Sequence, residues 1–197
     1  MDNAARIGPN ALLQLVPVLD RALGVAERAA LFARAGVPVP PPDAGMWPEA
    51  EVARLHRAVV LARPDLAPGL MRAAGLGTAE YILAHRIPRP AKALIRALPS
   101  PMAARLLTTA IGKHAWTFAG SGRFAVDNLR PLTVTISANP LACGFKEAPS
   151  CHWHAAVFER LYAALVWPLV DVTETACCAC GDAACRFQIT PQPQAPK

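Results

Sequence analysis

The first half of the chain carries apolar side chains at the spacing of helix faces. This pattern predicts helices over residues 10–23, 25–35, 49–61, 68–85 and 102–118, with a shorter one over 91–98. Residues 37–48 are rich in proline, which lacks the amide hydrogen that a helix needs, so a stiff loop is expected there. The N-terminal half is therefore predicted to be helical.

After Gly120 the pattern changes to the spacing of strands. Residues 123–128 and 132–138 favour strands, and the alternation in LTVTIS predicts that they form a half-exposed antiparallel pair. A helix is expected over 150–167, with Ser150 as its N-terminal cap. Strands over 170–176 and 185–190 should flank a turn at Gly181 and Asp182. The prediction is an α+β fold, an antiparallel β-sheet with helices packed on it.

The length of 197 residues suits one domain. We expect a single domain over residues 1–190, with a helical part over 1–119 and a sheet part over 120–190, and a disordered tail over 191–197. Hydrophobic residues make up 53% of the chain and charged residues 17%. This surplus of apolar surface indicates a large interior, a subunit interface or an apolar ligand.

The net charge of +6 comes from twenty basic and fourteen acidic residues spread from Arg6 to Lys197 with no dense basic run. Nucleic-acid binding is not expected without such a run and its aromatic partners, whereas an acidic small molecule or acidic partner is compatible. The N-terminus lacks a targeting signal, so a cytoplasmic location is expected. The longest apolar run, residues 161–170, contains Pro168 and is too short for a transmembrane segment.

Six cysteines lie between positions 143 and 185, and four of them fall within nine residues. Cytosolic thiols stay reduced, so this cluster predicts a metal site, and zinc suits thiolates best. Spacing alone leaves several ligand sets open. They are Cys151 with Cys177, Cys180 and Cys185; a set that uses His152 or His154; or an iron–sulfur cluster on Cys177, Cys178, Cys180 and Cys185.

The same stretch resembles the C-terminal motif of the 4-vinyl reductase domain family, relatives of which sense phenols in bacterial activators. That motif has a cysteine at a helix start, then Glu-x2-Cys on a strand, a Gly-Asp turn, and a last cysteine before an aromatic residue, here Phe187. The resemblance implies a structural zinc ion held by Cys151, Glu174, Cys177 and Cys185. It leaves Cys143, Cys178 and Cys180 without a role.

The opening ARIGPNALLQLVPVLDRALG, with the length and the cysteine block, looks like the photosynthetic-bacterial members of this family over almost the whole chain. The resemblance implies the fold shared with TRAPP-type transport proteins and a homodimer. The apolar helices expected over 10–23 and 102–118 would supply the dimer interface. It also implies a role in bacteriochlorophyll synthesis, with a magnesium tetrapyrrole intermediate as ligand and a biosynthetic enzyme as partner.

The family name implies reduction of a vinyl group, which needs a source of hydride or electrons. Gly75 and Gly77 lie inside a predicted helix, so they form no dinucleotide-binding fingerprint. An accessory tetrapyrrole-binding or carrier protein is therefore the first hypothesis, a true vinyl reductase the second, and a zinc-stabilised interaction scaffold the third. The candidate macrocycle contacts are His114, Trp116, His152 and His154, and the candidate partners for propionates are Arg86, Arg89, Lys92 and Lys113.

Overall fold

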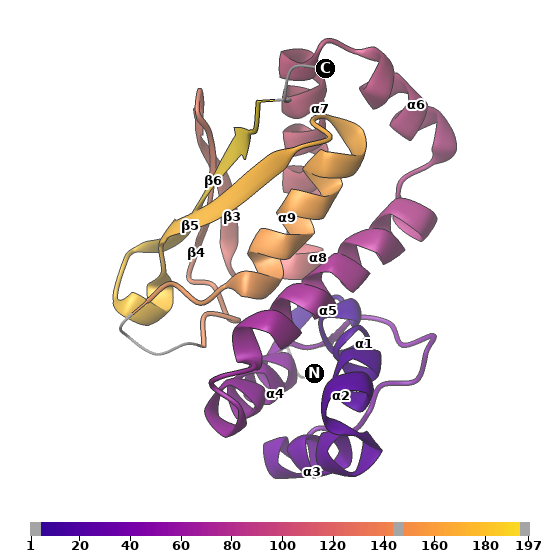
Figure 1. Cartoon of the computed structure of the whole chain (residues 1–197), viewed down its shortest axis with the longest axis vertical. Coiled ribbons are helices and arrows are strands. Elements are labelled where there is room, and N and C mark those ends of the chain that lie inside the picture. Colours follow the sequence, from indigo (N-terminus) through magenta and orange to yellow (C-terminus); the bar gives the residue numbers. More distant parts are fainter. Residues whose placement is uncertain (1–4, 144–147, 194–197) are drawn as a thin grey trace.

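The computed structural model describes residues 5–143 and 148–193 and has the α+β architecture expected (Figure 1). Helices fill the N-terminal half because apolar residues recur along one face of each. In chain order the helices before the sheet are α1 (Asn10–Leu13), α2 (Leu15–Leu23), α3 (Val25–Ala35), α4 (Glu49–Ala62), α5 (Ala67–Tyr81), the π-helix η1 (Ile82–Arg86), α6 (Arg89–Ala97), α7 (Ser100–Lys113) and α8 (Trp116–Ala119).

The main sheet has four antiparallel strands in the order β3-β4-β6-β5. Helix α9 (His152–Leu165) connects the two halves of the sheet in sequence and packs against β5 and β6, while α7 contacts β3. A separate two-residue pair joins β1 (Arg6–Ile7) to β2 (Trp47–Pro48). The main strands are β3 (Arg123–Leu129), β4 (Leu132–Ser137), β5 (Val170–Ala176) and β6 (Ala184–Pro191).

Each predicted helix and strand is present, with changed bounds where local geometry intervenes. The run over 10–23 is divided at Gln14, and the run over 68–85 passes from α5 into η1. The run over 102–118 is broken at His114, which caps the end of α7. Sequence periodicity does not reveal such breaks, because the apolar spacing continues through them.

The half-exposed pair predicted from the alternation in LTVTIS is present in part. This segment is β4, which lies between β3 and β6. Its apolar residues are buried, whereas on the other face Thr133 is buried and Thr135 and Ser137 are half-buried. Alternation along the sequence therefore corresponds to alternation of exposure only toward the end of the strand.

Two predicted boundaries at the ends of the last elements are also corrected. The N-cap of α9 is Cys151 rather than Ser150, and no side chain caps this helix. The expected tail begins too early, because β6 continues through Pro191 and the Gln192 amide donates to the Leu169 carbonyl. Residues 194–197 lie outside the described part of the chain.

The crossing of α5 and α9 joins the helical half to the sheet half. At this crossing Gly75 touches the backbone of α9, so a Cβ there would clash with the Trp153 carbonyl oxygen. Two ion pairs flank it, Arg72 with Glu159 and Arg160 with Glu80. The glycine is therefore required by close helix packing, and it lies within α5 and not at the strand-to-helix turn that a dinucleotide-binding fingerprint occupies.

Replacing Gly75 by alanine should force α5 and α9 apart and lower the free energy of unfolding by about 1–3 kcal/mol. Gly69 is the matched control on the same helix, because nothing lies within 4 Å of the position that a Cβ would take there. Gly69→Ala should be neutral or stabilise by up to about 1 kcal/mol through helix propensity. Chemical denaturation of both variants checks this, and equal stabilities would show that the crossing tolerates the extra methyl group.

Candidate metal centre

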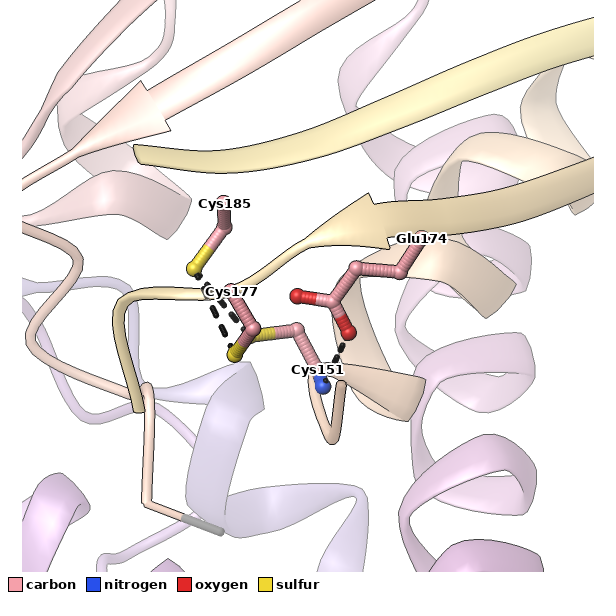
Figure 2. Close-up of side chains that lie close together, drawn as sticks. All are labelled: Cys151, Glu174, Cys177 and Cys185. Carbon is pink, nitrogen blue, oxygen red and sulfur yellow. Dashed lines mark hydrogen bonds between the residues drawn. The ribbon is translucent and has the colours of Figure 1, made fainter. Parts of the chain in front are cut away.

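Three segments of the sheet half converge on one buried point beside the start of α9 (Figure 2). Cys151 is the residue before α9, Glu174 lies on β5, Cys177 follows β5, and Cys185 lies on β6. Their ligand atoms all lie within 4.8 Å of one another. This group could hold a metal ion, and it is the set that the family motif implies.

The three sulfur atoms are spaced as the corners of a tetrahedral metal site require. Their separations are 3.7 Å for Cys151 and Cys177, 3.5 Å for Cys151 and Cys185, and 3.9 Å for Cys177 and Cys185. Metal–sulfur bonds of about 2.3 Å in tetrahedral geometry place sulfurs about 3.8 Å apart. All three cysteines are free thiols, and these separations are too long for disulfide bonds.

Glu174 completes the group with one oxygen engaged and one open. Its Oε2 accepts a hydrogen bond from the Cys151 amide at 2.7 Å, while Oε1 is buried without a hydrogen-bond partner. A buried carboxylate oxygen without a partner is unfavourable. A cation between the three sulfurs would satisfy it, so the donor set fits a divalent metal.

Neighbouring donors orient the sulfur atoms. The side-chain amide of Asn139 donates to the sulfurs of both Cys151 and Cys185 at 3.4 Å, and the Cys178 amide donates to Cys185 at 3.4 Å. The turn that carries Cys177 is closed by Asp182, whose carboxylate accepts from the Cys177 amide at 2.8 Å. Such N–H groups stabilise thiolates and support a metal site from its outer shell.

The same turn explains why glycine follows the cysteine-rich stretch. Residues Cys178–Cys180 form a single 3₁₀ turn, and Gly181 continues it with a φ of 97°. This left-handed conformation strains any residue with a Cβ. The Gly-Asp turn therefore returns the chain to β6 at the point where Cys185 faces Cys151.

Without a cation, the pKa values of the carboxyl and thiol groups in this cluster are strongly shifted. Burial raises the pKa of the Glu174 carboxyl to about 7, and hydrogen bonds among the sulfurs raise the pKa of the Cys151 thiol. Hydrogen bonds from Cys151 and Cys185 lower the pKa of Cys177, which becomes the favoured thiolate. Adding a cation would favour the charged form of every member, since opposite charge stabilises an anion that burial destabilises.

The alternative ligand sets left open by the spacing are not assembled in the described part of the chain. The metal-holding group contains neither Cys178 nor Cys180, so it does not match the four-thiolate arrangement considered for an iron–sulfur cluster. Cys178 directs its sulfur to the Ile136 carbonyl at 3.8 Å. Burial raises the pKa of the Cys143 thiol to about 12, as expected for an unreactive cysteine.

The predicted macrocycle contacts have different environments. His154 is buried, its Nε2 bonds to the Phe118 carbonyl at 3.1 Å, and burial lowers its pKa to about 4. His152 is half-buried, and burial also lowers its pKa. His114 and Trp116 lie at the surface on either side of the α7–α8 junction. Their role in ligand binding stays a prediction, with His154 engaged in the core.

The structure instead shows an open groove between α7 and β3, with a volume of about 500 Å³. The α7 side of the groove is polar and basic, and the other side is formed by the exposed strand β3. Its lining residues are Arg105, Thr108, Thr109, Val126, Asp127, Asn128 and Leu129. The sequence does not predict this groove, because the groove depends on the distance between α7 and the edge strand β3.

Charge in this groove is available for a ligand. Asp127 pairs with Arg186, and Arg105 has no carboxylate within 4.0 Å among the described residues. The Thr108 hydroxyl is held by Tyr162 at 2.5 Å, whereas Val126 and Leu129 are exposed. The groove therefore combines an unpaired cation on α7 with two exposed apolar side chains on β3.

The part of the chain that builds the metal centre matches a known family model. The 4-vinyl reductase domain model matches residues 132–191, which run from β4 to β6. The bacteriochlorophyll synthase 23 kDa chain of Cereibacter sphaeroides is 56% identical over 96% of this chain and 92% of its own length. The Rhodobacter capsulatus chain of the same name is 54% identical over 97% of this chain and 90% of its own length.

This chain belongs to the bacteriochlorophyll synthase 23 kDa chain family. The identities extend over the helical half, beyond the match to the domain model, so the whole of the described architecture is a family property. All four residues of the candidate metal centre lie within the range that the domain model matches.

Solved structures show that the fold itself is more widely used. An H-NOX protein from K. algicida in the unliganded Fe(II) state has a TM-score of 0.64 at 10% identity, covering 95% of this chain and 98% of that chain. An H-NOX protein from S. oneidensis has a TM-score of 0.57 at 10% identity, covering 95% of this chain and 100% of that chain. At such identity the likeness concerns the fold alone, and the TRAPP-type likeness stays an expectation.

Replacing Cys185 by serine should remove the bound metal, because it deletes one of three sulfurs that meet at the site. Cys180→Ser is the matched control, since Cys180 is outside the group. Metal content per chain, measured by mass spectrometry on both purified variants, checks this. Equal loss of metal from the two variants would mean that the ligand set differs from Cys151, Glu174, Cys177 and Cys185.

Proposed function

We propose that this member of the 23 kDa chain family is an accessory protein of bacteriochlorophyll biosynthesis that binds and carries a magnesium tetrapyrrole intermediate. The observation that carries the proposal is the identity of 54–56% with chains named for bacteriochlorophyll synthase, over nearly the full length. Relatives with that name support a biosynthetic enzyme of the same pathway as the partner. The homodimer and the cytoplasmic location stay predictions.

The metal of the 4-vinyl reductase domain is proposed to be zinc in a structural role. Three thiolates and a carboxylate form a ligand set that zinc accepts in tetrahedral geometry. With all four positions filled by protein, the ion has no open position for a substrate. Its task is then to join the start of α9 to the end of β5 and the start of β6, whose side chains Figure 2 shows meeting at the site.

The α7–β3 groove is the proposed place for the tetrapyrrole. A magnesium porphyrin intermediate has a flat apolar ring and carboxylates at its edge, so it needs an apolar surface beside a cation. Val126 and Leu129 supply exposed apolar surface, and Arg105 supplies the cation. The groove is open, which suits a carrier that must release its ligand to an enzyme.

Zinc should be found at about one ion per chain, and its removal by a chelator should destabilise the protein. Zinc buffered at about 1,000 times its dissociation constant stabilises a protein by about 4 kcal/mol. For a chain of this size that corresponds to about 8–16 °C in Tm. Differential scanning calorimetry of the zinc-loaded and chelated protein measures the shift, and an unchanged Tm would exclude a structural role for the ion.

The carrier proposal predicts that purified protein binds magnesium protoporphyrin IX with a shifted Soret band. Arg105→Gln should weaken binding by about 10–100-fold, because a hydrogen bond to a charged group contributes about 1.5–3 kcal/mol. The dimethyl ester of the same porphyrin should bind the wild type and Arg105→Gln equally, since it has no carboxylate to pair. Spectral titration gives all four affinities.

Arg34→Gln is the control for this charge change, because Arg34 is exposed on α3, outside the groove. Addition of NADPH to the complex should give no reduction of the vinyl group. Saturable reduction with NADPH or a simple electron donor would establish the vinyl reductase instead. Absence of porphyrin binding by the wild type would leave the interaction scaffold as the better hypothesis.

A further inference from the structure

Basic and acidic residues are unevenly divided along the chain. The 46 residues from Tyr81 to Val126 contain seven basic residues and no aspartate or glutamate. The other 151 residues contain thirteen basic and fourteen acidic residues. The whole net positive charge of the protein therefore comes from one continuous segment, which covers η1, α6, α7, α8 and the first half of β3.

This charge is not neutralised by the rest of the fold. The ion pairs among the described residues use cations outside the segment, at positions 28, 63, 72, 160 and 186. Within the segment Lys92 donates to the Leu83 carbonyl and Arg96 to the Ala164 carbonyl, contacts that fix the side chains and leave their charge. Arg86 lies over the ring of Tyr81. The segment presents a field of one sign.

Large apolar side chains are exposed on α6 and α7, two helices of this basic segment. The exposed fractions are 56% for Leu94 on α6, and 58% and 39% for Met102 and Leu106 on α7. Met102 and Leu106 are four residues apart and so share one face of α7, whose opposite face packs Ala103 and Leu107 into the core. These residues are not part of the core, and the same helices carry Arg89, Arg96 and Arg105, which are in none of the ion pairs among the described residues.

We infer that the corner of the molecule made by η1, α6 and the start of α7, here named the α6–α7 face, binds peripherally to an anionic lipid bilayer. Its exposed residues are Arg86, Arg89, Leu94, Arg96, Met102 and Leu106. A corner that carries both cations and exposed apolar side chains matches the headgroups and the acyl boundary of such a bilayer together. No described helix combines the length and apolar character needed to cross a membrane, so the contact is with the surface alone.

The position of the α6–α7 face favours a bilayer over an acidic protein. Figure 1 shows α6 and the adjoining end of α7 at the top of the molecule, at the opposite end from α3. The two helices are joined by Leu98 and the exposed Pro99, and the exposed Pro101 lies in the first turn of α7. A protruding corner with long cationic side chains suits a deformable lipid surface, whereas a specific protein partner usually fills a shaped pocket. Aromatic residues for stacking nucleic-acid bases are absent from α6 and α7.

The test is sedimentation with vesicles of phosphatidylcholine containing about one-third phosphatidylglycerol, compared with pure phosphatidylcholine vesicles. The wild type should bind the first and not the second, and higher salt should weaken binding. Arg86→Gln with Arg89→Gln should weaken binding about 30-fold, which is about 1 kcal/mol for each cation. Met102→Ser with Leu106→Ser should also weaken it, without loss of the salt dependence.

Two matched controls lie outside the segment. Arg21→Gln with Arg34→Gln removes the same charge from α2 and α3, and Val25→Ser with Leu61→Ser removes comparable exposed apolar surface. Both should bind vesicles as the wild type does. Equal losses in test and control pairs, binding to polyglutamate but not to vesicles, or no vesicle binding by the wild type would each overturn the inference. No porphyrin is added, so failure here leaves the carrier proposal standing.

Discussion

The convergence of three buried sulfurs and one buried carboxylate is the constraint on which the sheet half depends. Four acidic groups cannot all be ionised in an interior without a cation, and they cannot all be hydrogen-bonded to one another without leaving Glu174 Oε1 unpaired. A bound ion resolves both problems at once. Because its ligands would come from the start of α9, from β5 and the loop after it, and from β6, the ion would determine where the helix begins relative to the sheet.

That placement extends to the helical half through α9. Gly75 allows α5 to touch the α9 backbone just after Cys151, and the ion pairs of Arg72 and Arg160 hold the two helices in register. His154, one turn into α9, reaches across to the Phe118 carbonyl. The metal centre, the helix crossing and this buried histidine lie within the first turns of one helix, so a local disturbance at Cys151 should be felt in both halves.

Periodicity predicted nearly every helix and strand because the period of apolar residues is a local property. It could not predict what depends on neighbours. The burial of Thr133 depends on what packs over its face of the sheet, and the role of His154 depends on a carbonyl 36 residues away. Spacing of cysteines indicated a metal but left its ligands open, and Glu174 came only from the family resemblance. The basic residues form no dense run, and the informative pattern of charge is the absence of acidic residues from 81 to 126.

The two proposed surfaces share α7, and this has a consequence for how a carrier would work. Arg105 lines the groove. Met102 lies one turn before it on α7 and Leu106 directly follows it, and both belong to the α6–α7 face. A groove beside a bilayer contact would let a sparingly soluble macrocycle pass between lipid and protein with little of its apolar surface exposed to water. At about 25 cal/mol for each Å² of apolar area, exposing even about 200 Å² costs about 5 kcal/mol. Transfer along α7 would avoid this cost of exposing the macrocycle to water, which free diffusion would impose each time that the carrier takes up or releases its ligand.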